Sequence, residues 1–141
     1  MLLLYEGLEG IKKVWFDHLT QKESILEFVG IEDMHPTLQK YLKQFYIWER
    51  AKRKIPVKML ISGTTVAGIF DVQTDLYELR EVKNIKGNIF PVPLSCDIYG
   101  DNVSFTLHRK DSEPVGLIIR SKEIATAMRS LFTIIWSQLA Q

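Results

Sequence analysis

The sequence is poor in the residues that build disulfide frameworks and metal centres. Its 141 residues include one cysteine, Cys96, and three histidines. One thiol cannot form an intramolecular disulfide, and the scattered histidines do not provide the paired spacing of a zinc site. The glycines also do not form a phosphate-binding fingerprint. We therefore expect no metal and no cofactor, and the low cysteine count predicts a reducing, cytoplasmic location.

Charge of one sign and long apolar runs are also scarce. Eighteen basic and 17 acidic residues give a net charge of +1, too weak a field to favour nucleic acid or an anionic membrane as partner. The basic run Arg50, Lys52, Arg53 and Lys54 is interpreted as a solvated helix end. No apolar run approaches the roughly 18 to 20 residues of a membrane span. We expect a soluble chain that does not contact nucleic acid or membrane directly.

What the chain does contain is enough apolar material for one globular domain. The hydrophobic fraction is 46%, and the sequence shows no repeat, no linker and no low-complexity tract. A chain of this size buries well over half of the surface that its unfolded form exposes. Residues 1–141 are therefore expected to form a single effector or ligand-sensing domain.

The first half alternates strand and helix patterns. Apolar residues at spacings of three and four predict helices over residues 7–19 and 37–53, and short apolar runs predict strands at 2–5, 24–30 and 57–61. The order strand, helix, strand, helix, strand is typical of a mainly parallel sheet covered by helices. A short helix is predicted within residues 66–77.

The second half changes to short strands separated by turns. Strand patterns occur at residues 79–82, 94–99, 103–108 and 115–119, and the turn residues Gly100, Asp101 and Asn102 predict a hairpin. Closely spaced strands of this kind favour antiparallel pairing. Ser121 is a candidate N-cap for a terminal helix. The predicted fold class is thus α/β, a mixed sheet with a parallel-type first half, an antiparallel second half and a C-terminal helix.

Polar and aromatic residues inside these elements carry further expectations. Trp15, Trp48 and Trp136 lie on apolar helix faces and are expected in the core. Asp97 and Tyr99 are expected to share one face of a strand with Ser95 on the other, which leaves Asp97 in need of a partner, a cavity or a sheet end.

The histidines are expected to have no specific role. His18 is interpreted as a cation at the end of the first helix, where the helix dipole favours positive charge. His108 is interpreted as a strand-end residue that faces water.

Four blocks spread over the chain carry a family resemblance. They are residues 5–11, 50–57, 97–103 and 121–136. In order and spacing these blocks resemble the effector domain of TrmB-type transcriptional regulators, whose fold is similar to that of the phospholipase D superfamily. The resemblance implies a domain that binds a small molecule, such as a sugar or metabolite, or forms a homodimer, and thereby controls a DNA-binding module.

That module is usually an N-terminal winged helix, for which this chain leaves no room ahead of Tyr5. The chain is therefore expected to be either a separated domain or a protein that regulates transcription through a partner.

The resemblance also implies where a phospholipase D-like active site would lie. Such enzymes need a histidine nucleophile, a lysine two residues later and an aspartate five residues beyond that. With Asp101 as the aspartate, the other two positions hold Leu94 and Cys96, which cannot supply that chemistry. The spacing of His108 and Lys110 matches by coincidence only, because the position five residues after Lys110 holds Val115 and not an aspartate. We expect no catalytic residues and no enzyme activity.

The leading hypothesis is a non-enzymatic effector domain with a ligand pocket at the strand ends. Ser62, Cys96 and Asp97 are the candidate ligand-binding residues, because ligands of open α/β sheets collect at such ends. One alternative is a phosphodiesterase or nuclease of the same fold that uses His108 and Lys110. The other is a protein-interaction domain that pairs with a separate DNA-binding subunit.

Overall fold

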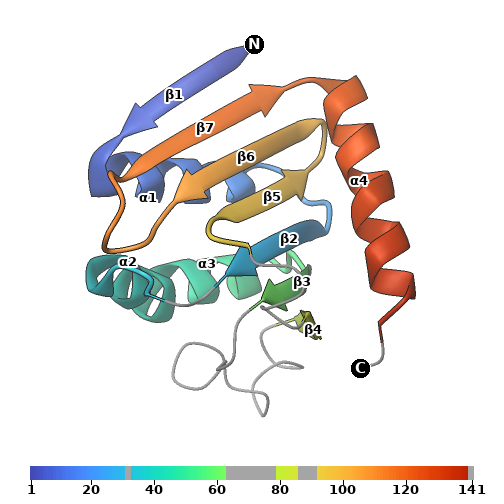
Figure 1. Cartoon of the computed structure of the whole chain (residues 1–141), viewed down its shortest axis with the longest axis horizontal. Coiled ribbons are helices and arrows are strands. Elements are labelled where there is room, and N and C mark those ends of the chain that lie inside the picture. The colour runs from blue at the N-terminus through green and yellow to red at the C-terminus, as the bar shows by residue number, and fades with distance from the viewer. Residues whose placement is uncertain (31–32, 63–78, 86–91, 140–141) are drawn as a thin grey trace.

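The protein is a mixed seven-stranded sheet with helices on both faces (Figure 1). The computed structural model describes residues 1–30, 33–62, 79–85 and 92–139. The strand order is β1-β7-β6-β5-β2-β3-β4. The helix predicted within residues 66–77 lies outside the described residues. Within the described ranges, none of the helices is long and apolar enough to cross a membrane.

The first half has the predicted alternation. It comprises β1 (Leu2–Glu6), α1 (Gly7–Asp17), β2 (Ile25–Gly30), the helices that follow, and β3 (Val57–Ser62). Strands β2 and β3 pair in parallel, as expected for strands joined by a helical crossover. Strand β1 lies at the opposite edge of the sheet, antiparallel to β7 (Val115–Arg120). The chain thus crosses most of the sheet between β1 and β2, and α1 covers the crossing.

The second half is antiparallel except for its first strand. Strands β5 (Ser95–Tyr99), β6 (Asn102–Leu107) and β7 pair antiparallel in sequence order, and β5 also pairs antiparallel with β2. The turn between β5 and β6 has Gly100 at φ +56°, as the Gly-Asp-Asn signal requires. Strand β4 (Arg80–Ile85) instead pairs in parallel with β3, so the antiparallel expectation for residues 79–82 was wrong. Pairing direction depends on the route of the connecting chain, which a strand pattern does not encode.

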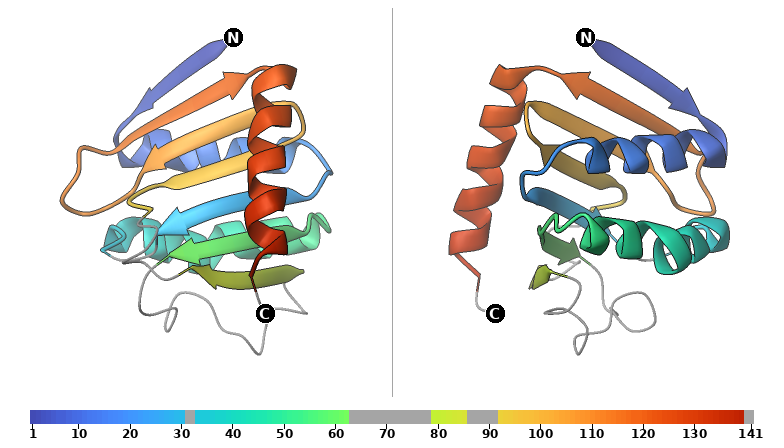
Figure 2. Two further views of the ribbon diagram at one scale, coloured as in Figure 1. Left: turned by 45° about the vertical axis from the view of Figure 1, so that its right-hand side comes forward. Right: turned by 180° about the vertical axis from the view of Figure 1, so that it is seen from behind.

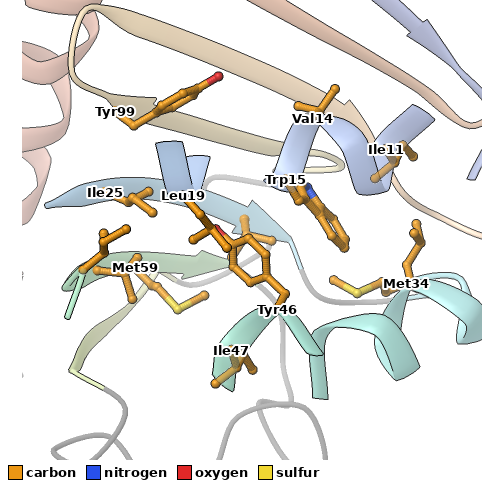
Figure 3. Packing of buried hydrophobic residues seen from close by; sticks show 14 of the residues in the cluster. Ile11, Val14, Trp15, Leu19, Ile25, Met34, Tyr46, Ile47, Met59 and Tyr99 are labelled. Carbon is orange, nitrogen blue, oxygen red and sulfur yellow. The ribbon is translucent and has the colours of Figure 1, made fainter. Parts of the chain in front are cut away.

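The sheet separates two core layers, and helices cover each of them (Figure 2). Helix α1 and the helices after β2 cover one face of the sheet, and α4 (Lys122–Ser137) crosses the other. Ser121 caps α4 as predicted, because its Oγ accepts a hydrogen bond of 3.2 Å from the Ile124 backbone N–H. The layer under α1 contains Trp15, Tyr46 and Met59 (Figure 3), and the layer under α4 contains Phe28 and Phe132.

The predicted helix 37–53 contains one wide turn that shifts its register. It consists of α2 (Pro36–Tyr41), the π-helical turn η2 (Leu42–Tyr46) and α3 (Ile47–Lys52). A π turn holds one more residue than an α turn, so every later side chain rotates around the helix axis. Tyr46 therefore points into the core, whereas Trp48 is 56% exposed. The expectation that Trp48 is a core residue was wrong for this reason.

Candidate functional site: a buried polar cluster under helix α1

Polar side chains occupy the sheet face that α1 covers. They come from alternate positions of three adjacent strands: Glu27 on β2, Ser95 and Asp97 on β5, and Ser104 and Thr106 on β6. Residues two apart on a strand share a face, so placing Ser95 opposite Asp97 was wrong. Tyr99 shares this face with Asp97, as expected, and lies in the same core layer. A core layer at the centre of a sheet is ordinarily apolar, and these polar groups therefore need partners.

A small cavity lies among these groups. Its volume is about 40 Å³, roughly that of three water molecules when one water requires about 10 to 15 Å³. Its charged and polar lining comprises His18, Glu27, Tyr46, Arg50, Arg80, Ser95 and Asp97. Apolar side chains such as Met34 and Met59 close the remainder. The cavity is thus a small polar chamber inside an apolar layer.

His18 links the helices to the sheet. It follows α1 at the start of the short 3-10 turn η1 (His18–Thr20) and is fully buried. Its Nε2 is hydrogen bonded to Ser104 Oγ at 2.8 Å, and its Nδ1 to Tyr46 OH at 3.0 Å. Burial lowers the pKa of His18 to about 3. The ring is therefore neutral at pH 7, with one nitrogen donating and the other accepting, and the expectation of a dipole-stabilised cation was wrong.

Asp97 is held in its protonated form. Burial raises its pKa well above the ordinary value, and the charge of Glu27 and a hydrogen bond between the two carboxyl groups raise it further. Ser95 Oγ lies 3.0 Å from Asp97 Oδ2 and 3.1 Å from Glu27 Oε2. The protonated form of Asp97 is favoured, because a second charge of the same sign next to Glu27 would be costly. Although Asp97 Oδ2 is 3.8 Å from His18 Nε2, this contact is not an ion pair, since both groups are neutral.

The arrangement can hold protons and polar molecules, but it is not a nucleophilic triad. A triad needs the carboxyl group on the ring nitrogen that faces away from the serine, and here Tyr46 occupies that nitrogen. Ser104 Oγ is hydrogen bonded to His18, yet Ser104 is fully buried and does not line the cavity. The cluster therefore offers hydrogen-bond donors and acceptors without an accessible nucleophile.

The structure does not bring Ser62, Cys96 and Asp97 together. Asp97 lines the cavity under α1, whereas Cys96 belongs to the core layer under α4. Ser62 shares the α4 side of β3 with Leu60, and its Oγ accepts a hydrogen bond of 3.0 Å from the Val92 backbone N–H. Burial raises the pKa of the Cys96 thiol, so this group stays protonated. The ligand role of these three residues stays a prediction, but they cannot line one common pocket.

Two of the three phospholipase D-like positions, Leu94 and Cys96, lie on the α4 face. Leu94 packs against the core layer under α4, as Cys96 does, and Asp101 is exposed on the turn after β5. His108 is buried under α1, on the opposite face of the sheet from Leu94 and Cys96. Its ring centroid lies 6.4 Å from that of Trp15, and burial lowers its pKa to about 4. The expectation that His108 faces water was therefore wrong.

Sequence reasoning missed His18, Tyr46 and Glu27 as members of a common cluster. His18 and Ser104 are 86 residues apart, and Ser95 and Glu27 are 68 residues apart. One signal was available: Ser95, Asp97, Ser104 and Thr106 are polar residues at period two within strands that helices were expected to cover. This alternation indicates that one face of the sheet is not packed by apolar side chains alone.

The fold defines the structural class of the chain. Its mixed sheet with helices on both faces is an α/β fold similar to that of solved phospholipase D family members. Among solved structures, the chain is similar to Nuc from Salmonella typhimurium, a phospholipase D family member, with TM-score 0.67 at 15% identity over 99% of this chain and 96% of that one. NucT from Helicobacter pylori gives TM-score 0.67 at 14% identity over 99% of this chain and 98% of that one.

A third similar structure comes from a DNA-binding protein. The archaeal chromatin protein TrmBL2, which shows a novel mode of DNA binding, gives TM-score 0.64 at 13% identity. The match covers 99% of this chain and 53% of TrmBL2, so the chain spans about half of that protein. No protein-family model and no curated protein sequence matches the chain. At these identities, the likeness shows the fold alone.

Proposed function

We propose that this chain is a non-catalytic effector domain of a TrmB-like regulator, which binds a small polar molecule in the cavity under α1. The observation that carries the proposal is the cavity of about 40 Å³ with seven charged or polar side chains in its lining. Polar groups that serve only packing are costly inside a core. A recognition site needs them, because a few convergent polar groups fix the orientation of a ligand.

The lining favours a hydroxyl-rich ligand. Glu27 and Asp97 line the chamber with carboxyl groups, and Arg50 and Arg80 line it with guanidinium groups. A hydroxyl group both donates and accepts, so sugars and other polyols satisfy both kinds of partner. A ligand of that size needs more room than three waters, which requires the α2–α3 segment to move away from the sheet. This movement would transmit occupancy to a regulatory partner, and a homodimer remains the predicted assembly.

A thermal-shift screen with a panel of sugars and polyols tests the proposal. A ligand at about 100 times its Kd should stabilise the protein by about 2.7 kcal/mol, which raises Tm on the order of 8 °C. Glu27→Gln should reduce the shift strongly, because it removes the charge that pairs with ligand hydroxyls. Asp101→Asn, at an exposed turn, is the matched control and should retain the shift. If no ligand of the panel stabilises the parent, or if Glu27→Gln responds like the parent, the sensing proposal fails.

Phosphodiester hydrolysis is the alternative that the similarity to Nuc and NucT raises. Its candidate residues are separated, because His108 is buried under α1 and Lys110 is exposed. We expect no hydrolysis of a chromogenic phosphodiester by the purified protein. Turnover in the parent that His108→Ala abolishes would establish the alternative and remove the non-catalytic assignment.

A further inference from the structure

The π-helical turn η2 places two aromatic side chains in solvent. Phe45 is 39% exposed and Trp48 is 56% exposed, whereas the neighbouring Tyr46 and Ile47 are buried. An uninterrupted α-helix with the predicted apolar stripe would have buried Phe45 and Trp48 instead. Exposing part of a large ring loses the hydrophobic stabilisation that its full burial would give. A helix that turns aromatic residues outward at this cost indicates a surface for contact.

Helix α1 extends this aromatic surface. Phe16 is 37% exposed, and its ring stacks near Phe45 with a centroid separation of 6.2 Å. Tyr41 lies 5.4 Å from Phe45 by the same measure. Cations flank the rings: Lys12 Nζ is 5.6 Å from the Tyr41 centroid, and the Arg53 guanidinium is 5.1 Å from that of Phe16. We call this the aromatic–basic surface, formed by Lys12, Lys13, Phe16, Tyr41, Phe45, Trp48, Lys52 and Arg53.

The helical layer that carries this surface is strongly basic. Helix α1 and residues 36–54 contain eight basic and three acidic side chains, a net charge of +5, or +4 without Arg50, which is buried. The whole chain carries only +1, so the remainder carries −4. Two of the acidic groups are paired within the layer, Glu9 with Lys12 at 2.9 Å and Glu49 with Arg53 at 3.3 Å. The net charge of the whole chain is therefore close to zero although this helical layer has an excess of basic side chains.

The aromatic–basic surface includes an open cleft between α1 and α2. Its volume is about 300 Å³, and it is lined by Glu9, Lys12, Lys13, Phe16 and Tyr41. It is open to solvent and much larger than the buried cavity of about 40 Å³. An open cleft with aromatic walls and ammonium groups at its rim matches a planar group that carries nearby negative charge.

We propose that the aromatic–basic surface binds single-stranded nucleic acid, with bases stacked on Phe45 and Trp48 and phosphates near the surrounding lysines. Strand-binding proteins combine the same two elements, aromatic rings for stacking and a basic track for the backbone. A protein partner fits less well, because lysine is depleted at protein interfaces and this surface holds three lysines, Lys12, Lys13 and Lys52. Duplex DNA offers phosphates but keeps its bases stacked inside, so the rings would have no partner.

This inference goes beyond the effector function and is independent of the cavity. The surface lies on the outer side of the helical layer, and the polar cluster lies between that layer and the sheet. It also reverses the expectation of no nucleic-acid contact. That expectation used the net charge of the chain, which averages the basic helical layer with the acidic remainder.

Fluorescence anisotropy with a labelled oligothymidylate of about 15 nucleotides tests the proposal. We expect binding that weakens with salt, and quenching of Trp48, because its ring is the most exposed of the three tryptophans. Phe45→Ala/Trp48→Ala should weaken binding about 10-fold to 100-fold, since each stacked base contributes roughly a factor of 5 to 150. Lys13→Gln/Lys52→Gln should weaken binding and reduce the slope of log K against log salt by about 0.7 for each phosphate that the variant no longer neutralises.

The matched control is Leu131→Ala/Ile134→Ala, a pair of exposed apolar residues on α4 that should leave binding unchanged. All substituted positions are exposed, and circular dichroism verifies that each variant is folded. Absence of binding at low salt overturns the proposal. Equal affinity for duplex DNA, polyglutamate, anionic vesicles or a mononucleotide also overturns it, as does unchanged binding by both surface variants.

Discussion

Replacing Asp97 with asparagine is expected to make the protein increasingly more stable than the parent as the pH rises. The native state keeps Asp97 protonated because burial and Glu27 raise its pKa well above the ordinary value. In the unfolded chain, an aspartate releases its proton near pH 3.9. Between these two pKa values, the native state binds more protons than the unfolded state, so stability is present at low pH and lost as the pH rises.

Asparagine removes this titration while keeping the shape and an N–H donor toward Glu27. The difference in unfolding free energy between variant and parent should grow by about 1.4 kcal/mol per pH unit, from about pH 4 to the raised pKa. Urea unfolding of both proteins at several pH values between 5 and 8 measures this slope. Asp101→Asn should show no such slope. A pH-independent difference for Asp97→Asn would contradict a raised pKa of Asp97 in the native state.

Replacing His108 with phenylalanine is expected to stabilise the protein, and more so in acid. Both ring nitrogens of His108 are buried and have no hydrogen-bond partner among the described residues. Leaving a buried polar group unsatisfied costs about 1 to 3 kcal/mol, which a phenyl ring against Trp15 avoids. At pH 7 the variant should therefore be more stable than the parent by an amount in this range.

Acid adds a second contribution from the titration of His108. Its pKa is about 4 in the native state because of burial, and about 6.5 in an unfolded chain. As the pH falls from 6.5 toward 4, only the unfolded state takes up this proton, so the parent loses stability. The advantage of the variant should grow by about 2 kcal/mol between pH 7 and pH 5. A constant advantage in denaturant titrations would mean that packing alone is responsible.

The sequence patterns predicted what depends on local chemistry. The alternation of strands and helices, the turn at Gly100 and the cap at Ser121 follow from residues within a few positions of each other. The parallel pairing of β4 was missed because it depends on how residues far apart in the chain meet. The polar cluster was missed for the same reason, since His18 is interpretable only when Ser104 and Tyr46 are known to lie beside it.

The register of the second helix could not be predicted from helical periodicity. A period of 3.6 residues assumes a constant turn, so a stripe that fits Leu38 and Tyr41 continues through Phe45 and Trp48. The π-helical turn breaks this assumption after Tyr41, and Tyr46 and Arg50 take the inward positions.

The extra residue in η2 therefore determines two properties on opposite sides of one helix, the hydrogen bond between Tyr46 and His18 on the inner side and the exposure of Phe45 and Trp48 on the outer side. Because Tyr46 meets His18 only in the shifted register, deleting a residue from 42–46 would carry that hydroxyl away from the imidazole and draw Phe45 and Trp48 toward the sheet. A substitution could alter one side alone, whereas a change in chain length would alter both. Homologues with an insertion or deletion in residues 42–46 should therefore lose both features, and homologues of unchanged length in this segment should keep both.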